Sequence, residues 1–117
     1  MVWKGKQAFI SPVLIDEWEF IDDGCNAGEV HWLRRSGPDE RLLSAGLWRH
    51  LPDGRPEGLP YRVVGSETMY VIDGAAELTL PDGSTLWLQE GYLASFKDGF
   101  EATWRTKEPF MKFFVVT

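Results

Sequence analysis

Residues 54–74, with the sequence GRPEGLPYRVVGSETMYVIDG, and residues 91–102, with the sequence GYLASFKDGFEA, decide the fold of this chain. In both stretches, short runs of β-branched and aromatic residues end at glycine, which adopts the positive φ of tight turns without steric cost. Such runs continue to the C-terminus, and no long run shows a helical apolar stripe free of Gly and Pro. Many short strands at regular spacing predict an all-β sandwich or closed barrel.

The expected strands follow from these runs and from the turn residues between them. We expect strands at residues 8–13, 29–35, 42–51, 61–64, 67–73, 75–81, 84–89, 92–97, 101–106 and 110–117. Asp73-Gly74 and Pro81-Asp82-Gly83 are predicted hairpin turns. Residues 1–117 are interpreted as one domain. Within it, residues 46–117 form the barrel core, and residues 1–45 form an N-terminal arm of extra strands that covers the barrel or packs on a second copy.

Composition limits the partners. The chain has 117 residues and a formal net charge of −6, and Arg34-Arg35 is its only adjacent basic pair. Nucleic acids and anionic membranes are bound through clustered Lys and Arg, so we expect neither as a partner. The single cysteine, Cys25, cannot form an intrachain disulfide, and no signal peptide or membrane-spanning run is visible. These features predict a soluble cytoplasmic protein.

The two stretches resemble the paired motifs of the cupin family. The first cupin motif is Gly, five residues, His-x-His, three or four residues, Glu, six residues and Gly. The second is Gly, five residues, Pro-x-Gly, two residues and His. With the four-residue spacing, the matching residues are Gly54, Glu67, Gly74, Gly91 and Gly99. This resemblance implies an all-β cupin double-stranded β-helix, which is a jelly-roll barrel.

The motif positions that hold metal ligands are mostly changed. Of the three His and one Glu that the resemblance implies, only Glu67 remains, and the His positions hold Pro60, Arg62 and Ala102. The three-residue spacing would instead place Tyr61 and Val63 at the first two. Because a transition metal needs about three or four protein ligands, we expect no tightly held metal and no other cofactor. Weak binding of a divalent ion through Glu67 stays open.

A narrower resemblance is to small cupins related to the (S)-ureidoglycine aminohydrolase cupin domain. It rests on residues 67–74, Gly91, Thr103-Trp104 and Lys112, with Gly46-Leu47-Trp48 at the opening strand. It implies the fold more strongly than the activity, because most of these small cupins have no assigned reaction and a fold hosts many functions.

Glu67 is the centre of the predicted ligand-binding site. Residues two apart on a strand share a face, so an inward Glu67 places Met69 beside it. A buried carboxylate needs a partner, and the candidates are Arg62, at a former ligand position, and Lys112, among aromatic residues. The remaining candidates, each of which could instead belong to the core or an interface, are Tyr61, Trp48 and Trp104. His31 and His50 lie outside the motifs and are predicted to be structural or solvent-facing.

Three functions stay open. The favoured one is a cupin of unassigned activity that binds a small polar metabolite near Glu67. The second is an enzyme on a ureido, amino or sugar compound, aminohydrolase- or isomerase-like, with Glu67 as base and Lys112 as acid. The third is a structural or regulatory dimerisation module. We also predict a homodimer, because exposed strand edges need cover; its candidate contacts are Trp3, Phe9, Trp18 and Trp32.

Overall fold

The computed structural model describes residues 3–4, 8–22, 26–35 and 43–117, which form strands, turns and loops with no helix among them. The strands are β1 (Trp3–Lys4), β2 (Phe9–Ile10), β3 (Glu19–Asp22), β4 (Asn26–Arg34), β5 (Ser44–His50), β6 (Leu59–Arg62), β7 (Glu67–Thr79), β8 (Thr85–Gln89), β9 (Leu93–Phe96) and β10 (Glu101–Val116). The predicted all-β class is confirmed. In the described part of the chain no helix is long and apolar enough to cross a membrane.

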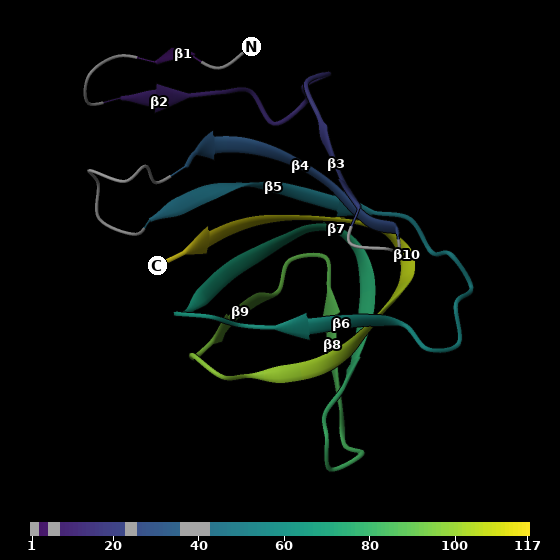
Figure 1. The fold of residues 1–117 in the computed structure, drawn as a ribbon. Coiled ribbons are helices and arrows are strands. Elements are labelled where there is room, and N and C mark those ends of the chain that lie inside the picture. Colours follow the sequence, from purple (N-terminus) through teal and green to yellow (C-terminus); the bar gives the residue numbers. More distant parts are fainter. Residues whose placement is uncertain (1–2, 5–7, 23–25, 36–42) are drawn as a thin grey trace.

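The strands from β3 to β10 form one antiparallel sheet that folds over on itself (Figure 1). Its order is β3-β4-β5-β10-β7-β8, while β6 also pairs with β10 and β9 with β7. The long strands β7 and β10 belong to both layers. The first part of β7 pairs with β9 and its last part with β8. Similarly, β10 pairs first with β6 and then with β5. Two layers that share their long strands make the expected jelly-roll barrel.

A predicted hairpin turn proves to be a bend inside a strand. Asp73-Gly74 lies within the continuous strand β7, and β10 likewise runs through Pro109. The register between the two strands shifts at this level. Gly74 has a φ of 80°, and a Cβ on it would overlap the carbonyl oxygen of Pro109. Glycine therefore lets the two bends pack on each other, as in a β-bulge. By contrast, the predicted turn at Pro81-Asp82-Gly83 is present, with Gly83 N donating to the Leu80 carbonyl at 2.9 Å.

The bend also changes which residues of β7 face the barrel interior. Glu67, Met69 and Val71 are buried before it, as the predicted alternation requires, and Ala76 and Leu78 are buried after it. One extra residue at the bend moves the inner face from odd to even positions. The buried residues of β7 continue into one apolar core with Trp104 and Phe110 of β10.

The N-terminal part differs most from the prediction. The expected strand at residues 8–13 is reduced to β2, which pairs with β1 in a separate two-stranded sheet. Strand β3 was not predicted, yet it pairs with β4, and β4 pairs with β5. Strands β3 and β4 thus extend the barrel sheet (Figure 1). Cys25 and the side chain of Trp3 lie outside the described residues.

Candidate functional site

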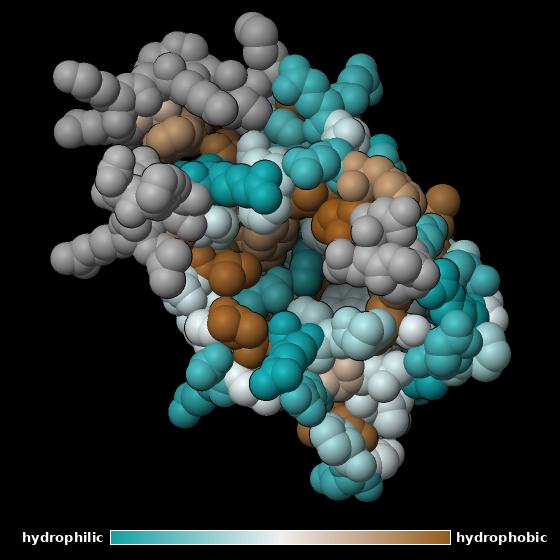
Figure 2. All heavy atoms as spheres, in the orientation of Figure 1, coloured by the Kyte–Doolittle hydropathy of each residue, from teal (hydrophilic) through white to brown (hydrophobic). Residues whose placement is uncertain are grey.

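A cavity of about 290 Å³ lies within the folded sheet, where it is lined by residues of β3 to β7 and of β10. Its wall is apolar and aromatic except for one ionisable cluster, and it is formed by Ile21, Ala27, Val30, Trp32, Trp48, Leu59, Pro60, Tyr61, Glu67, Trp104, Lys112, Phe114 and Val116. This volume is near the lower limit of ligand cavities, which measure about 300–1,000 Å³. Figure 2 shows the barrel face hollowed at its centre, with hydrophilic residues at the bottom of the hollow.

Three strands bring the ionisable cluster together. Glu67 is the first residue of β7, Tyr61 lies on β6 and Lys112 on β10. Lys112 Nζ donates a hydrogen bond to Glu67 Oε2 at 2.7 Å, and the Tyr61 hydroxyl donates to Glu67 Oε1 at 2.6 Å. The Lys112 and Glu67 side chains are only 7% and 10% exposed. Glu67 is therefore buried with a cation, as expected, and the cation is Lys112.

Aromatic rings surround the ammonium of Lys112. Its Nζ lies 5.1 Å from the ring centroid of Trp48, 5.3 Å from Tyr61, 5.1 Å from Trp104 and 6.0 Å from Phe114. A cation within about 6 Å of a ring face is attracted by the ring quadrupole, and more strongly when it is desolvated. The rings therefore offset part of the cost of burying this charge, which explains a lysine in an aromatic strand.

Burial acts on the pKa values of both donors. Loss of solvent lowers the pKa of the Lys112 ammonium, while the charge of Glu67 and its hydrogen bond oppose this shift. Burial also raises the pKa of the Tyr61 hydroxyl far above its usual value, and the Glu67 carboxylate raises it further through its charge and its hydrogen bond. Tyr61 consequently keeps its proton at neutral pH and remains a hydrogen-bond donor to Glu67.

The two tryptophans beside Lys112 are fixed by their N–H groups. Trp48 Nε1 donates to the Ala27 carbonyl at 2.9 Å, and Trp104 Nε1 donates to Thr106 Oγ1 at 2.9 Å. Their rings meet edge to face, with centroids 5.3 Å apart and planes at 87°. Because both N–H groups have partners, this aromatic wall keeps one orientation toward the cavity.

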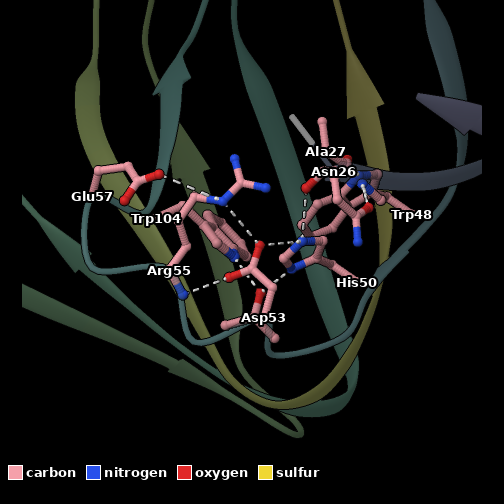
Figure 3. Close-up of polar contacts among 10 residues, drawn as sticks. Asn26, Ala27, Trp48, His50, Asp53, Arg55, Glu57 and Trp104 are labelled. Atoms are coloured by element: carbon pink, nitrogen blue, oxygen red, sulfur yellow. Dashed lines mark hydrogen bonds and ion pairs between the residues drawn. The ribbon is translucent and has the colours of Figure 1, made fainter. Parts of the chain in front are cut away.

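A buried histidine supports the same wall from behind (Figure 3). The His50 ring stacks on Trp48 at 5.5 Å, its Nε2 lies 3.0 Å from the Asn26 carbonyl oxygen, and its Nδ1 lies 2.7 Å from Thr106 Oγ1. A carbonyl only accepts, so in the neutral ring Nε2 carries the proton and Nδ1 accepts from the Thr106 hydroxyl. Asp53 approaches Nε2 at 4.0 Å. His50 thus has a structural role in positioning the wall.

Most of the predicted site residues line this cavity. Tyr61, Trp48, Trp104, Glu67 and Lys112 do so. Met69 does not, because it is 1% exposed within the packed core.

Arg62 is the main correction to the predicted site. Its side chain is 71% exposed and pairs with Glu101 at 3.5 Å. On and just after β6, Leu59 and Val63 are buried and Tyr61 contacts the core, whereas Pro60 and Arg62 are exposed. Alternation therefore turns Arg62 away from Glu67. The three-residue motif spacing, which selects Tyr61 and Val63, matches the inward positions.

Sequence reasoning missed part of the cavity wall. Trp32, expected at a dimer contact, lines the cavity, packs edge to face on Phe114 at 5.7 Å and donates to Glu19 Oε2 at 3.2 Å. Trp18, another expected dimer contact, lies under the Arg49 guanidinium at 3.9 Å. Phe114 could have been found, because it lies two residues after Lys112 and shares its face.

The residues at the ligand positions of the cupin motif do not fit a metal ion. In the spacing that faces inward they are Tyr61 and Val63, with Ala102 opposite Tyr61 on β10. Val63 and Ala102 have no donor atom, and burial keeps Tyr61 protonated. Both oxygens of Glu67 already accept hydrogen bonds. In the described ranges no group of three or more His, Cys, Asp or Glu could hold a metal ion.

Comparisons with known proteins agree with this architecture. Residues 54–114 match the family of EutQ-like cupin domains. A Salmonella typhimurium LT2 structure described as ethanolamine utilization protein Q has a TM-score of 0.76 at 14% identity, covering 99% of this chain and 91% of that one. A DUF861 family protein from Thermotoga maritima has a TM-score of 0.55 at 24% identity, covering 61% of this chain and 76% of that one. The Clostridium difficile EutQ protein has a TM-score of 0.59 at 18% identity, covering 83% of this chain and 74% of that one. Identities this low show the fold alone. Among curated proteins none matches the sequence.

Proposed function

This chain belongs to the family of EutQ-like cupin domains, and we propose that it binds a small polar metabolite in the cavity beside Glu67 and Lys112. The observation that carries the proposal is a buried, hydrogen-bonded ion pair on the wall of a cavity that is otherwise apolar. A few convergent polar groups against apolar walls are the usual composition of a small-molecule site.

The charges and donors of the cluster select the ligand chemistry. The opposite charges of Glu67 and Lys112 cancel, so the site favours a neutral or zwitterionic compound. The Lys112 ammonium has three N–H groups and uses one on Glu67, and the Tyr61 oxygen can still accept. A ligand with an acceptor for Lys112 and a donor for Tyr61 or Glu67 satisfies both. Hydroxylated, hydroxycarbonyl and amino-acid-like metabolites have this combination.

The size of the cavity limits the ligand further. At about 290 Å³ it fits a compound at the small end of metabolite size. The presence of this cavity means that side chains do not fill the barrel completely.

Binding can be tested with a matched pair of variants. Ala27→Leu adds a larger side chain to the cavity wall, whereas Val64→Leu enlarges a residue that is 75% exposed. We would screen small polyols, hydroxy ketones and amino acids by thermal shift, then confirm hits by calorimetry. A ligand at about ten times its Kd stabilises the fold by about 1.4 kcal/mol, which shifts Tm by several degrees. The shift should disappear in Ala27→Leu and persist in Val64→Leu. No shift with any compound, or equal shifts in both variants, would reject the site.

Catalysis on a ureido or amino compound, in the manner of an aminohydrolase, is the second candidate. It is favoured by the short hydrogen bonds of Tyr61 and Lys112 to Glu67, which place a proton acceptor and a proton donor at one point of the cavity wall. Glu67→Gln removes the acceptor with little change in shape and should abolish turnover. Turnover that survives this change would rule out Glu67 as the base.

We also propose that the chain forms a homodimer and acts in the cytoplasm. The homodimer is supported by exposed apolar side chains in the N-terminal segment, which a second copy would cover. They are Ile10, Val13, Leu14 and Phe20. The cytoplasmic location is supported by the presence of only one cysteine. Light scattering at micromolar concentration should give twice the mass of one chain, and a monomer mass contradicts the dimer.

A further inference from the structure

Lys112 combines three properties that suit covalent chemistry on a ligand. Among the cavity-lining residues that the structure describes, it alone carries an amine. Its Nζ is 2.7 Å from a carboxylate that can accept a proton. Its side chain is 7% exposed, so bulk water has little access to the nitrogen. A desolvated lysine amine beside a proton acceptor is the arrangement used for covalent attack on carbonyl compounds.

We propose that Lys112 captures small uncharged aldehydes or ketones as a protonated imine inside the cavity. This inference rests on the proposed function, because the carbonyl compound must enter the same cavity. It adds a covalent step and names a substrate class.

The step balances within the cluster. Lys112 passes one proton to Glu67 along their hydrogen bond, and the free amine forms a C–N bond to the carbonyl carbon. The carbonyl oxygen takes that proton from Glu67. A second proton moves from nitrogen to the same oxygen through Glu67, and the nitrogen lone pair then expels the oxygen as water. The ammonium and the carbonyl compound become the protonated imine and water, so no oxidant or reductant is needed.

The surroundings of Lys112 suit the product as well as the starting ammonium. The nitrogen carries one positive charge before and after condensation. Glu67 and the rings of Trp48 and Trp104, which stabilise the ammonium now, would therefore stabilise the imine. A cavity of about 290 Å³ leaves room for a carbonyl compound of few atoms.

Reductive trapping tests the proposal on the unaltered protein. We would incubate the chain with glycolaldehyde, and separately with hydroxyacetone, in the presence of cyanoborohydride, which reduces imines and fixes them. At limiting reagent, intact mass should show no more than one adduct on any chain, and peptide mapping should place it on Lys112. The exposed lysines Lys97 and Lys107 are internal controls. Labelling that follows exposure, with Lys97 and Lys107 modified at least as fast as Lys112, would overturn the proposal.

Two further comparisons keep the outcomes distinct. Lys112→Arg keeps the charge but removes the amine, and the single adduct should be lost while Lys97 and Lys107 still react slowly. Ethylene glycol and propylene glycol, which lack the carbonyl, report simple binding by thermal shift. If they bind but no adduct forms on Lys112, the covalent step is wrong and the binding site stands. If neither binding nor an adduct is observed, both proposals fail.

Discussion

Replacing Lys112 with Met tests whether the buried ion pair holds the barrel together. Met keeps the length and apolar character of the lysine stem but removes the ammonium. Glu67, whose side chain is 10% exposed, is then left with Tyr61 as its hydrogen-bond donor. The lost charged hydrogen bond contributes about 1.5–3 kcal/mol, and the lost ring contacts contribute about 2 kcal/mol. Their sum agrees with the cost of about 3–5 kcal/mol for removing one partner of a buried pair.

The assay is urea unfolding followed by tryptophan fluorescence and by circular dichroism. A small domain has about 5–15 kcal/mol of stability, so the Lys112→Met midpoint should fall sharply. Lys97→Met, at an exposed position, is the matched control and should change stability by less than about 0.5 kcal/mol. A second variant, Glu67→Gln with Lys112→Met, removes both charges and should recover much of the loss, because no buried charge is then unpaired. The reasoning is refuted if Lys112→Met costs less than about 1 kcal/mol, or if the double variant is as unstable as the two single changes added together.

Three other changes test separate parts of the structure. Tyr61→Phe removes the second donor to the buried carboxylate and should cost about 1.5–3 kcal/mol at neutral pH. The pKa of Tyr61 is raised above its usual 10.0 in the folded state. The contribution of the Tyr61 hydroxyl to folding stability is therefore full below pH 10.0 and decreases as the pH rises above it. Urea midpoints of the wild type should fall more steeply at alkaline pH than those of Tyr61→Phe. Thr106→Val leaves the His50 and Trp104 ring nitrogens without their partner, and calorimetry should show a loss of about 1–3 kcal/mol per unpaired group. Gly74→Ala should lower the free energy of unfolding clearly more than Gly83→Ala. A Cβ at residue 83 meets no atom within 4 Å, so Gly83→Ala should lose only about 1–2 kcal/mol through the positive φ of that residue. Equal unfolding midpoints for the two variants would show that the contact of Gly74 with Pro109 is unimportant.

The sequence predicts the class of fold well because its strongest signals are local. Alternation along residues 67–71 correctly places Glu67, Met69 and Val71 on the inner face. The prediction of a hairpin turn at Asp73-Gly74 was wrong because a hairpin and a bulge both require a residue with positive φ. What distinguishes them is the carbonyl of Pro109, a residue far along the chain that no local pattern connects to Gly74.

The site is predicted less completely for a related reason. Motif spacing identified Glu67, but it left two registers for β6, and the four-residue register put Arg62 rather than Tyr61 toward the interior. Pairing with β10 decides between them, because Tyr61 lies opposite Ala102 on that strand. The wall formed by Trp32 depends on β3 and β4 joining the barrel sheet, which the irregular N-terminal sequence does not indicate.

Two close backbone contacts explain why the acid and the amine meet at all. A one-residue slip of β7 against β10 would turn every inward side chain of this segment outward. At one end of the segment, Ser66 and Thr117 exchange backbone hydrogen bonds of 3.1 and 3.0 Å, and a Cβ on Gly65 would overlap the Thr117 carbonyl. At the other end, Gly74 packs against Pro109 in the same manner. The buried ion pair lies between these two glycine contacts, so its geometry depends on residues that touch neither charge. A side chain at either glycine should therefore weaken the ion pair through the register, even though every residue of the cavity wall is unchanged.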